Sequence, residues 1–359
     1  MKEDNPNKKE ELHALLDDWY KSIVRRYKEE AVENEKLVDD RIIEINDPDI
    51  FIKYKLIKIR YRLLIEDFGT IEVLFQELKE MKKYFSEEND YYYNYFFGQY
   101  KYIKDDDFTE SLIFLEKAEE LHNKVNKKEP ELYYLLALVN SRQYDTLFAL
   151  HYGKTALEMF IKEMNFLKVV ESHIILAINH IRMKDYKVAE SYLIHSIKFA
   201  EDANDKYLLG RIFHNLGYLH SKIKESNVAI KYYLDSLNYK KDNPQDYTHT
   251  LTYLIDEYLI INDIKEAKIL TLCGIKMARK YKVEENLMKL KFLYYKIIDG
   301  EMRHQKHIEK KIIPYYKQRK NWKEVSNYTA FLAEYFYDKH RYKKAAHYYK
   351  MAVDSIKKV

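Results

Sequence analysis

The stretch DYKVAESYLIHSIKFA, residues 185–200, carries the pattern that decides the fold. Counted from Tyr186, a small residue stands at +3 (Ala189), a large apolar residue at +7 (Leu193) and a small residue again at +10 (Ser196). Steps of three and four place these side chains on one face of an α-helix. The small residues let a second helix approach this face closely, and the large ones fill the layer between helices.

The same face recurs along most of the chain. Matching segments begin at positions 108, 146, 186, 226, 264 and 342. Successive starts lie 38 or 40 residues apart, and the last interval is twice as long, which predicts one further, degenerate unit between 285 and 320. An apolar-periodic stretch precedes each segment, such as RIFHNLGYLHSKI at 211–223, and supplies a first helix. We predict about seven tetratricopeptide (TPR) helix pairs in a right-handed superhelix, with the first helices lining an inner groove.

A different region precedes the repeats. The stretch NDPD, residues 46–49, offers Asn46 or Asp47 as a helix cap and Pro48 for the first turn of a helix. Gly69 is expected to end this third helix, so we predict a three-helix bundle over 1–69, a linker helix over 70–89 and a TPR domain over 90–359. Apolar residues at helical spacing define the three helices: Leu12, Leu15, Trp19, Ile23 and Tyr27; Val38, Ile42 and Ile45; Ile50, Tyr54, Ile57, Tyr61, Leu64 and Phe68.

Composition supports an all-α protein and argues against several other classes. The chain has 7 Gly and 5 Pro among 359 residues, too few for the turns of a sheet protein or a dinucleotide-binding fold. Lys and Arg number 62 and Asp and Glu 58, interleaved along the chain, so bulk charge gives no sign of a nucleic-acid partner. The single cysteine, Cys273, predicts a reducing compartment and is expected to be buried. Without a signal peptide or a long apolar run, we expect a cytoplasmic protein with no membrane contact.

The sequence carries no strong motif for catalysis or for a cofactor. Its glycines are scattered, so no phosphate-binding loop is formed. His304 and His307 share a helix face but have no third ligand at a fixed spacing, which favours a solvated face over a metal site. We therefore predict no metal and no cofactor.

Two asparagines on first helices are candidates for contacts in the groove. Asn215 lies in FHNLG, residues 213–217, and Asn179 lies in LAINH, residues 176–180. A buried amide costs stability unless it is paired. Each side chain can therefore either hold the backbone of an extended peptide or make a hydrogen bond between helices.

The order and spacing of these parts resemble the Rap family of cytoplasmic, peptide-regulated proteins from sporulating Gram-positive bacteria. The resemblance covers nearly the whole chain. It implies that the bundle and linker bind a response regulator, and that a short imported peptide in the TPR groove switches this binding. It also implies peptide contacts by Asn215 and Asn179, and we expect regulator contacts by Asp47, Asp49 and Tyr54. The resemblance is carried by Trp19 and Tyr20, YKLIKIRYRLLIEDF at 54–68, YYYNYFFGQYKYIKDDDF at 91–108 and GRIFHNLGYLHS at 210–221.

One position departs from the family pattern. Phosphatase members carry a glutamine at the start of the third bundle helix, where its amide orients the attacking water. Aligning on RYRLL, residues 60–64, places Pro48 there, and proline has no side-chain donor or acceptor. The carboxylates of Asp47 and Asp49 would repel an aspartyl phosphate. We therefore assign no catalytic residue and predict that the protein sequesters its response regulator instead of dephosphorylating it.

Two alternatives remain open. The first is an aspartyl-phosphate phosphatase that its peptide inhibits. The second is a peptide-responsive transcription regulator. Against the second, residues 9–68 predict three long helices without a short helix-turn-helix, so we expect no direct nucleic-acid partner.

Overall fold

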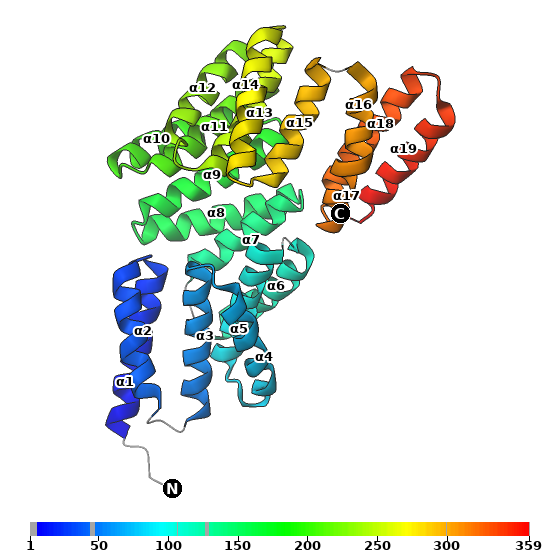
Figure 1. The fold of residues 1–359 in the computed structure, drawn as a ribbon. Coiled ribbons are helices and arrows are strands. Elements are labelled where there is room, and N and C mark those ends of the chain that lie inside the picture. The colour runs from blue at the N-terminus through cyan, green and yellow to red at the C-terminus, as the bar shows by residue number, and fades with distance from the viewer. Residues whose placement is uncertain (1–5, 44–46, 106, 126–128, 299, 359) are drawn as a thin grey trace. The chain divides into compact units, whose positions relative to one another are not determined.

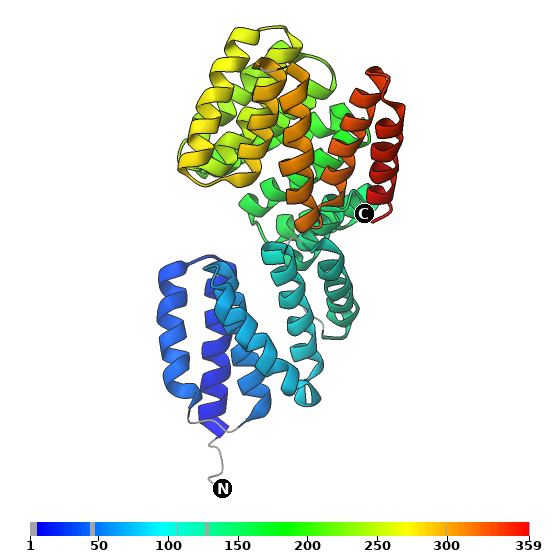
Figure 2. The ribbon, with the colours of Figure 1, turned by 45° about the vertical axis from the view of Figure 1, so that its right-hand side comes forward.

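The computed structural model describes residues 6–43, 47–105, 107–125, 129–298 and 300–358, and every regular element in these ranges is helical (Figures 1 and 2). The prediction of an all-α fold is confirmed. The chain forms two compact units, Met1–Arg142 (unit 1) and Gln143–Val359 (unit 2). This division separates the two helices of the predicted pair whose second helix begins at 146, and the division into bundle, linker and TPR domain stays a prediction.

Unit 1 begins with three helices packed around Trp19, whose side chain is fully buried between the rings of Tyr54 and Tyr61. The helices of unit 1 are α1 (Pro6–Val24), α2 (Lys28–Ile42), α3 (Pro48–Leu64), α4 (Phe68–Glu80), a 3-10 turn (Lys82–Tyr84), α5 (Glu87–Tyr100), a π segment (Lys101–Asp105), α6 (Phe108–Val125) and α7 (Pro130–Arg142).

The NDPD stretch is the joint that starts α3. Asp47 is the N-cap, and its Oδ1 accepts hydrogen bonds from the backbone N–H groups of Asp49 and Ile50 at 3.0 and 3.5 Å. Pro48 is the first helical residue, where a missing N–H costs nothing. The other predicted cap, Asn46, lies outside the described residues.

The predicted end of the third helix at Gly69 is wrong. Helix α3 ends at Leu64, Glu66 turns the chain with a φ of 60°, and Asp67 caps α4 by accepting from the Thr70 N–H at 3.3 Å. Gly69 therefore lies in the first turn of α4. The apolar spacing runs on through Phe68 because that side chain packs at the start of the next helix, against Tyr100.

Helices α6, α8, α10, α12, α14 and α19 begin at the positions that the repeat predicts. The residues at +3 and +10 of these helices are buried. These residues are small because the two helices of a pair approach each other closely at these positions. At one of them the Ser236 hydroxyl donates to the Gly210 carbonyl of the paired helix at 2.7 Å. The helices of unit 2 are α8 (Thr146–Lys162), α9 (Phe166–Arg182), α10 (Tyr186–Asp202), α11 (Lys206–Lys222), α12 (Ser226–Tyr239), α13 (Pro244–Ile260), α14 (Ile264–Lys280), α15 (Glu284–Ile298), α16 (Gly300–His307), a π segment (Ile308–Ile312), α17 (Ile313–Gln318), α18 (Trp322–Asp338) and α19 (Tyr342–Ile356).

The degenerate unit between 285 and 320 contains α15 and a broken second helix. A π segment separates α16 from α17, directly before Pro314. Proline has no N–H to donate to the preceding turn, so the regular hydrogen-bond ladder is interrupted there. This break explains why the repeat pattern is lost in the sequence while the helical layer continues.

First helices contact their neighbours in unit 2: α9 packs on α11, α11 on α13 and α13 on α15. These contacts place the first helices on the inner side of the superhelix in unit 2, as the repeat pattern predicts. The turns between successive helices of unit 2 are alike. Most of them place one non-glycine residue in the left-handed region of backbone conformation, and an Asp or Asn that caps the next helix often follows. These residues are Tyr144, Met164, Lys184, Asn204, Lys224, Asn262, Lys282, Lys320 and His340.

Candidate functional site

Asn215 lies in the middle of α11, on the inner side of unit 2. Its side chain is 7% exposed, and its Nδ2 donates to the Arg211 carbonyl one turn earlier at 2.8 Å. Its Oδ1 accepts no hydrogen bond from the described part of the chain, yet it is not closed off from solvent. The amide makes no bond to another helix in these ranges, so an acceptor stays available for a backbone N–H of a ligand.

Asn179 occupies a different environment. It is fully buried on α9, and its Nδ2 donates to the Ile175 carbonyl at 2.9 Å. Its Oδ1 accepts from Arg182 Nη1 at 3.1 Å. This side chain presents no surface to a ligand and instead fixes the direction of the Arg182 guanidinium.

Arg182 belongs to a group of cations and tyrosines that converge from distant parts of unit 2. Its guanidinium carbon lies 4.5 Å from the ring centroid of Tyr144, in the turn before α8. The Lys323 Nζ, from the first turn of α18, lies 4.7 Å from the same centroid. We call Tyr144, Arg182 and Lys323 the cation–tyrosine cluster. Tyr253 of α13 lies nearby: burial raises its pKa, and the charges of Tyr218, Glu324 and Tyr144 raise it further.

Polar groups that sequence analysis missed meet at His214, the residue before Asn215. The His214 Nδ1 and the Lys240 Nζ approach the Thr250 hydroxyl at 3.1 and 2.8 Å. Burial lowers the pKa of Lys240 to about 8, although Asp246 opposes the shift. Burial also holds the pKa of His214 well below its ordinary value, and the charge of Lys240 adds to this effect. The His214 imidazole is therefore neutral at pH 7.

The three residues predicted to meet a response regulator each have a different partner within unit 1. Asp47 is engaged by Lys9, whose Nζ lies 3.0 Å from Oδ2. Burial acts to raise the pKa of Asp47, but the hydrogen bonds from Lys9 and the backbone outweigh it and lower the pKa. The Asp49 Oδ1 accepts from Asn89 of α5 at 2.6 Å. Both carboxylates therefore hold parts of unit 1 together.

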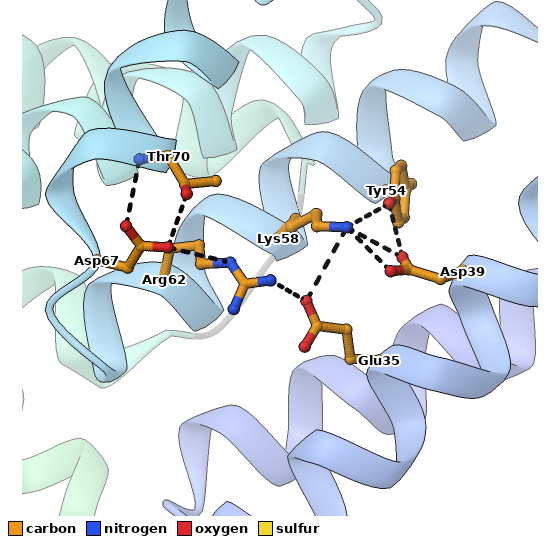
Figure 3. A network of polar contacts seen from close by, with 7 residues as sticks. All are labelled: Glu35, Asp39, Tyr54, Lys58, Arg62, Asp67 and Thr70. Atoms are coloured by element: carbon orange, nitrogen blue, oxygen red, sulfur yellow. Dashed lines mark hydrogen bonds and ion pairs between the residues drawn. The ribbon is translucent and has the colours of Figure 1, made fainter.

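Tyr54 belongs to a polar network between α2, α3 and the start of α4 (Figure 3). Its hydroxyl donates to the Asp39 Oδ1 at 2.6 Å and accepts from the Lys58 Nζ at 2.7 Å. Farther along α3, Arg62 pairs with Glu35 and lies 3.8 Å from Asp67, the cap of α4. The four-residue spacing of Tyr54, Lys58 and Arg62 is a sequence signal for this network.

A second polar network ties α1 and α3 to the start of α7. The hydroxyls of Tyr20 and Tyr92 donate to the two carboxylate oxygens of Glu129 at 2.7 and 2.8 Å. The Arg60 Nη2 lies 2.9 Å from the Glu131 Oε2. Burial raises the pKa of Glu129, and the two tyrosine hydrogen bonds oppose that shift. No sequence motif indicated this network, because its members are spread over residues 20 to 131.

Two expectations about reactive side chains are wrong. Cys273 is exposed, because it sits one position before the buried Gly274 and points off the packed face. His304 is buried against Phe292, at 4.4 Å between ring centroids, and burial lowers its pKa to about 4.

Within the described ranges, no group of three or more His, Cys, Asp or Glu side chains is placed to hold a metal ion. None of the described helices is both long and apolar enough to cross a membrane.

Comparisons with known proteins place the chain among bacterial regulators. No protein-family profile matches the sequence. The chain is 29% identical to the transcriptional activator NprA of Geobacillus stearothermophilus, over 98% of this chain and 89% of NprA. It is 24% identical to the regulatory protein RapD of Bacillus subtilis strain 168, over 92% of this chain and 95% of RapD.

The solved structures that resemble this chain include proteins related in name to these sequences. The apo form of the quorum sensor NprR from B. thuringiensis superposes with a TM-score of 0.82 and 25% identity, covering 97% of this chain and 99% of that one. NprR in complex with its cognate peptide NprX gives a TM-score of 0.78 at 24% identity, covering 96% of this chain and 98% of that one.

Proposed function

The chain belongs to the Rap family, and on that premise we propose that it is a regulator switched by a short signalling peptide bound to the inner wall of unit 2. The observation that carries this proposal is the Asn215 Oδ1, which is open to solvent and unpaired on a first helix. An amide oxygen in that position accepts from the backbone of an extended peptide without requiring a particular side chain. The similarity to NprR, a protein solved with its peptide NprX, supports the same reading.

Asn215 is the proposed direct contact, and Asn179 acts through Arg182. The Asn179 amide is fully buried, so its proposed role is to hold the guanidinium where a ligand meets it. Replacing Asn215 with alanine is expected to weaken peptide binding by about tenfold, the loss typical of one well-placed hydrogen bond.

A matched control separates binding from stability. Asn140→Ala removes an equivalent bond, from Nδ2 to the carbonyl four residues earlier at 2.9 Å, from helix α7. The probes are synthetic peptides that cover the C-terminal ends of short secreted reading frames beside the gene, measured by calorimetry. If Asn215→Ala lowers the melting temperature as much as Asn140→Ala and leaves peptide affinity unchanged, the proposed role of Asn215 is wrong.

We further propose that a response regulator binds α1–α4 and is sequestered there. Pro48 supports sequestration over catalysis, because the first turn of α3 offers no side-chain amide at this position. The surfaces around Asp47, Asp49 and Tyr54 remain the proposed contact region, and the bonds of Asp47 and Asp49 to Lys9 and Asn89 would hold that region in shape.

Mixing the protein with purified phosphorylated response regulators tests this proposal. Co-elution without faster phosphate loss is the expected result. Phosphate loss that the protein accelerates, and that a substitution in α3 abolishes, would establish the phosphatase alternative instead.

Transcription regulation is the second candidate, favoured by the description of NprA as a transcriptional activator. Helices α1 to α3 are 19, 15 and 17 residues long and pack as a bundle, which is unlike a short helix-turn-helix. A gel-shift titration with salt distinguishes the two: nanomolar DNA binding with a steep salt dependence would favour transcription regulation.

A further inference from the structure

We propose that the exposed face of α19 is a docking surface for an acidic amphipathic helix of a partner protein. We call this surface the α19 stripe, and it consists of Tyr342, Ala346, Tyr349, Val353 and Ile356. The inference goes beyond the proposed function, because it concerns a second helix of unit 2 and needs no peptide on the first helices.

The α19 stripe has the spacing of a helix–helix seam. Its members follow one another at steps of four, three, four and three residues, which places them on one line along the helix. All five are exposed, and Tyr349, Val353 and Ile356 are exposed to 42%, 53% and 56%. A continuous apolar line on a water-facing helix marks a contact surface, whereas single exposed apolar residues do not.

The same face is buried on earlier second helices of unit 2. Positions are counted from the first residue of each helix, as in the repeat. The side chains at +7 and +14 of α10 and α14 are completely buried, and those at +11 of α12 and α14 are nearly so. These residues are Leu193, Ala200, Thr271, Ala278, Leu237 and Ile275. On α19 the same three positions hold Tyr349, Val353 and Ile356, which are exposed.

The paired first helix does not account for this difference. Helix α19 has such a partner in α18, and its small residues at +3 and +10, Ala345 and Ala352, are buried as in the other units. At this contact the Ser326 hydroxyl of α18 donates to the Ala352 carbonyl at 3.1 Å.

The following first helix does account for it. Helices α11, α13 and α15 pack on α10, α12 and α14, respectively. In the described part of the chain no helix takes that place on α19, which lies at the edge of the helical layer beside α18 (Figures 1 and 2). The exposed end of a repeat array is usually polar. The α19 stripe is instead an apolar stacking face, which fits a helix in the place that a following first helix takes elsewhere.

A row of lysines beside the stripe sets the chemistry of the occupant. Lys343, Lys350 and Lys357 lie seven residues apart, on the side of the stripe away from α18. None of their ammonium groups has an ion-pair or hydrogen-bond partner in the described ranges. The one acid of α19, Asp354, lies farther round the helix and pairs with none of them. A helix seated on the stripe would therefore meet three free cations along one flank, which favours Asp and Glu there.

The same row disfavours a second copy of this chain as the occupant. Two α19 helices packed antiparallel, with Tyr349 at the two-fold axis, would bring the two Lys350 side chains together. Each Lys343 would then lie against a Lys357. Like charges in such close pairs weaken association, whereas an acidic flank on a partner helix turns the same positions into attractive contacts.

The length of the stripe fixes the size of the partner helix. From Tyr342 to Ile356 the stripe extends about 21 Å along the helix axis. The partner therefore needs about four turns, with apolar residues at steps of four and three and acidic residues along one flank.

The test uses the full chain and a displayed library of helices of about 18 residues. Apolar residues are fixed at steps of four and three, and the flanking positions carry Glu, Lys or Gln. Helices retained by the wild type are synthesised with Glu flanks and with Lys flanks. Both forms are titrated into the wild type, Val353→Asp and the triple variant Lys343→Glu/Lys350→Glu/Lys357→Glu. The matched control is Ile194→Asp, because Ile194 is an apolar residue of α10 with 45% exposure outside the stripe.

We expect the wild type to retain helices with Glu flanks. Val353→Asp should weaken their binding by about tenfold or more, because a carboxylate replaces an apolar side chain at the centre of the contact, and Ile194→Asp should not. In the triple variant the order should reverse, with Lys flanks bound about tenfold more tightly than Glu flanks. All substituted positions are exposed, so each variant should keep the melting temperature of the wild type.

Each other outcome overturns the proposal. If no retained helix depends on Val353, the stripe is not a docking surface for helices. If Glu and Lys flanks bind the wild type equally, the lysine row does not select an acidic partner. A dimer in sedimentation equilibrium that dissociates in Val353→Asp would show that a second copy covers the stripe. Binding to phosphatidylglycerol vesicles but not to phosphatidylcholine vesicles, lost in Val353→Asp and without helix binding, would assign the stripe to a membrane surface.

Discussion

Replacing Arg60 with methionine tests how firmly α3 is tied to α7. The Arg60 side chain is 9% exposed, and its partner Glu131 is 15% exposed. Burial alone would lower the pKa of Arg60, but the charge of Glu131 raises it, so the guanidinium is charged. Methionine keeps the apolar stem and removes the cation from a carboxylate that stays buried. Losing one partner of a buried pair costs about 3–5 kcal/mol, and the partial exposure places our expectation near 3 kcal/mol.

Urea unfolding followed by tryptophan fluorescence measures this loss. Trp19 lies in unit 1 and Trp322 in unit 2, so a Trp322→Phe background lets the signal report on unit 1. Adding Glu131→Leu to Arg60→Met should restore most of the stability, because both buried charges are then gone. Arg25→Met, at an exposed site, serves as the control. A loss below about 1 kcal/mol, or a double variant no more stable than the single one, would refute the reasoning.

Three further substitutions probe packing and charge. Gly217→Ala should cost about 1–3 kcal/mol in urea unfolding, because a Cβ there would lie 2.7 Å from the Tyr233 ring, whereas Gly69→Ala, whose Cβ would meet the Asp67 Oδ1 at an ordinary contact distance of 4.0 Å, should be tolerated. Lys240→Met should stabilise the protein at pH 7 by up to about 3 kcal/mol. The folded-state pKa of Lys240, about 8, lies below its unfolded value, so that advantage should shrink as pH rises from about 8 to 10.5; a constant difference would contradict the burial of the charge. Asp47→Ala should cost about 1 kcal/mol at pH 7; because the folded-state pKa of Asp47 is lowered, the cost should disappear as thermal melts are taken to pH values below that pKa.

The repeat was predictable because one packing constraint recurs along the chain. The second helix of each regular pair needs a small residue at +3 and +10, and these requirements leave a mark in the sequence at residues such as Ala189 and Ser196. The N-cap of α3 was equally predictable from the sequence, since Asp47 and Pro48 act only on neighbouring backbone groups. Such local signals do not depend on how distant segments meet.

The remaining features depend on contacts between distant residues. Tyr54 was expected in the apolar seam of the third helix and at a regulator contact, and no periodicity indicated that its hydroxyl is held by Asp39 and Lys58. His304 was expected on a solvated face and packs against Phe292 and Phe331, rings that two other helices supply. The cation–tyrosine cluster joins residues 144, 182 and 323, and no periodicity links them.

Under the proposed function, the Glu129 carboxylate would set a threshold between the binding of a peptide and the response to it. Tyr20 on α1 and Tyr92 on α5 share this one acceptor, so moving α1 away would strand a buried polar group at a cost of about 1–3 kcal/mol. Breaking the Arg60–Glu131 pair would add to that cost. A ligand shifts a conformational equilibrium only by the difference between its affinities for the two states. Under the proposed function, a peptide that binds both arrangements equally well would fill the protein and leave its output unchanged, and so would act as a silent competitor of the true signal.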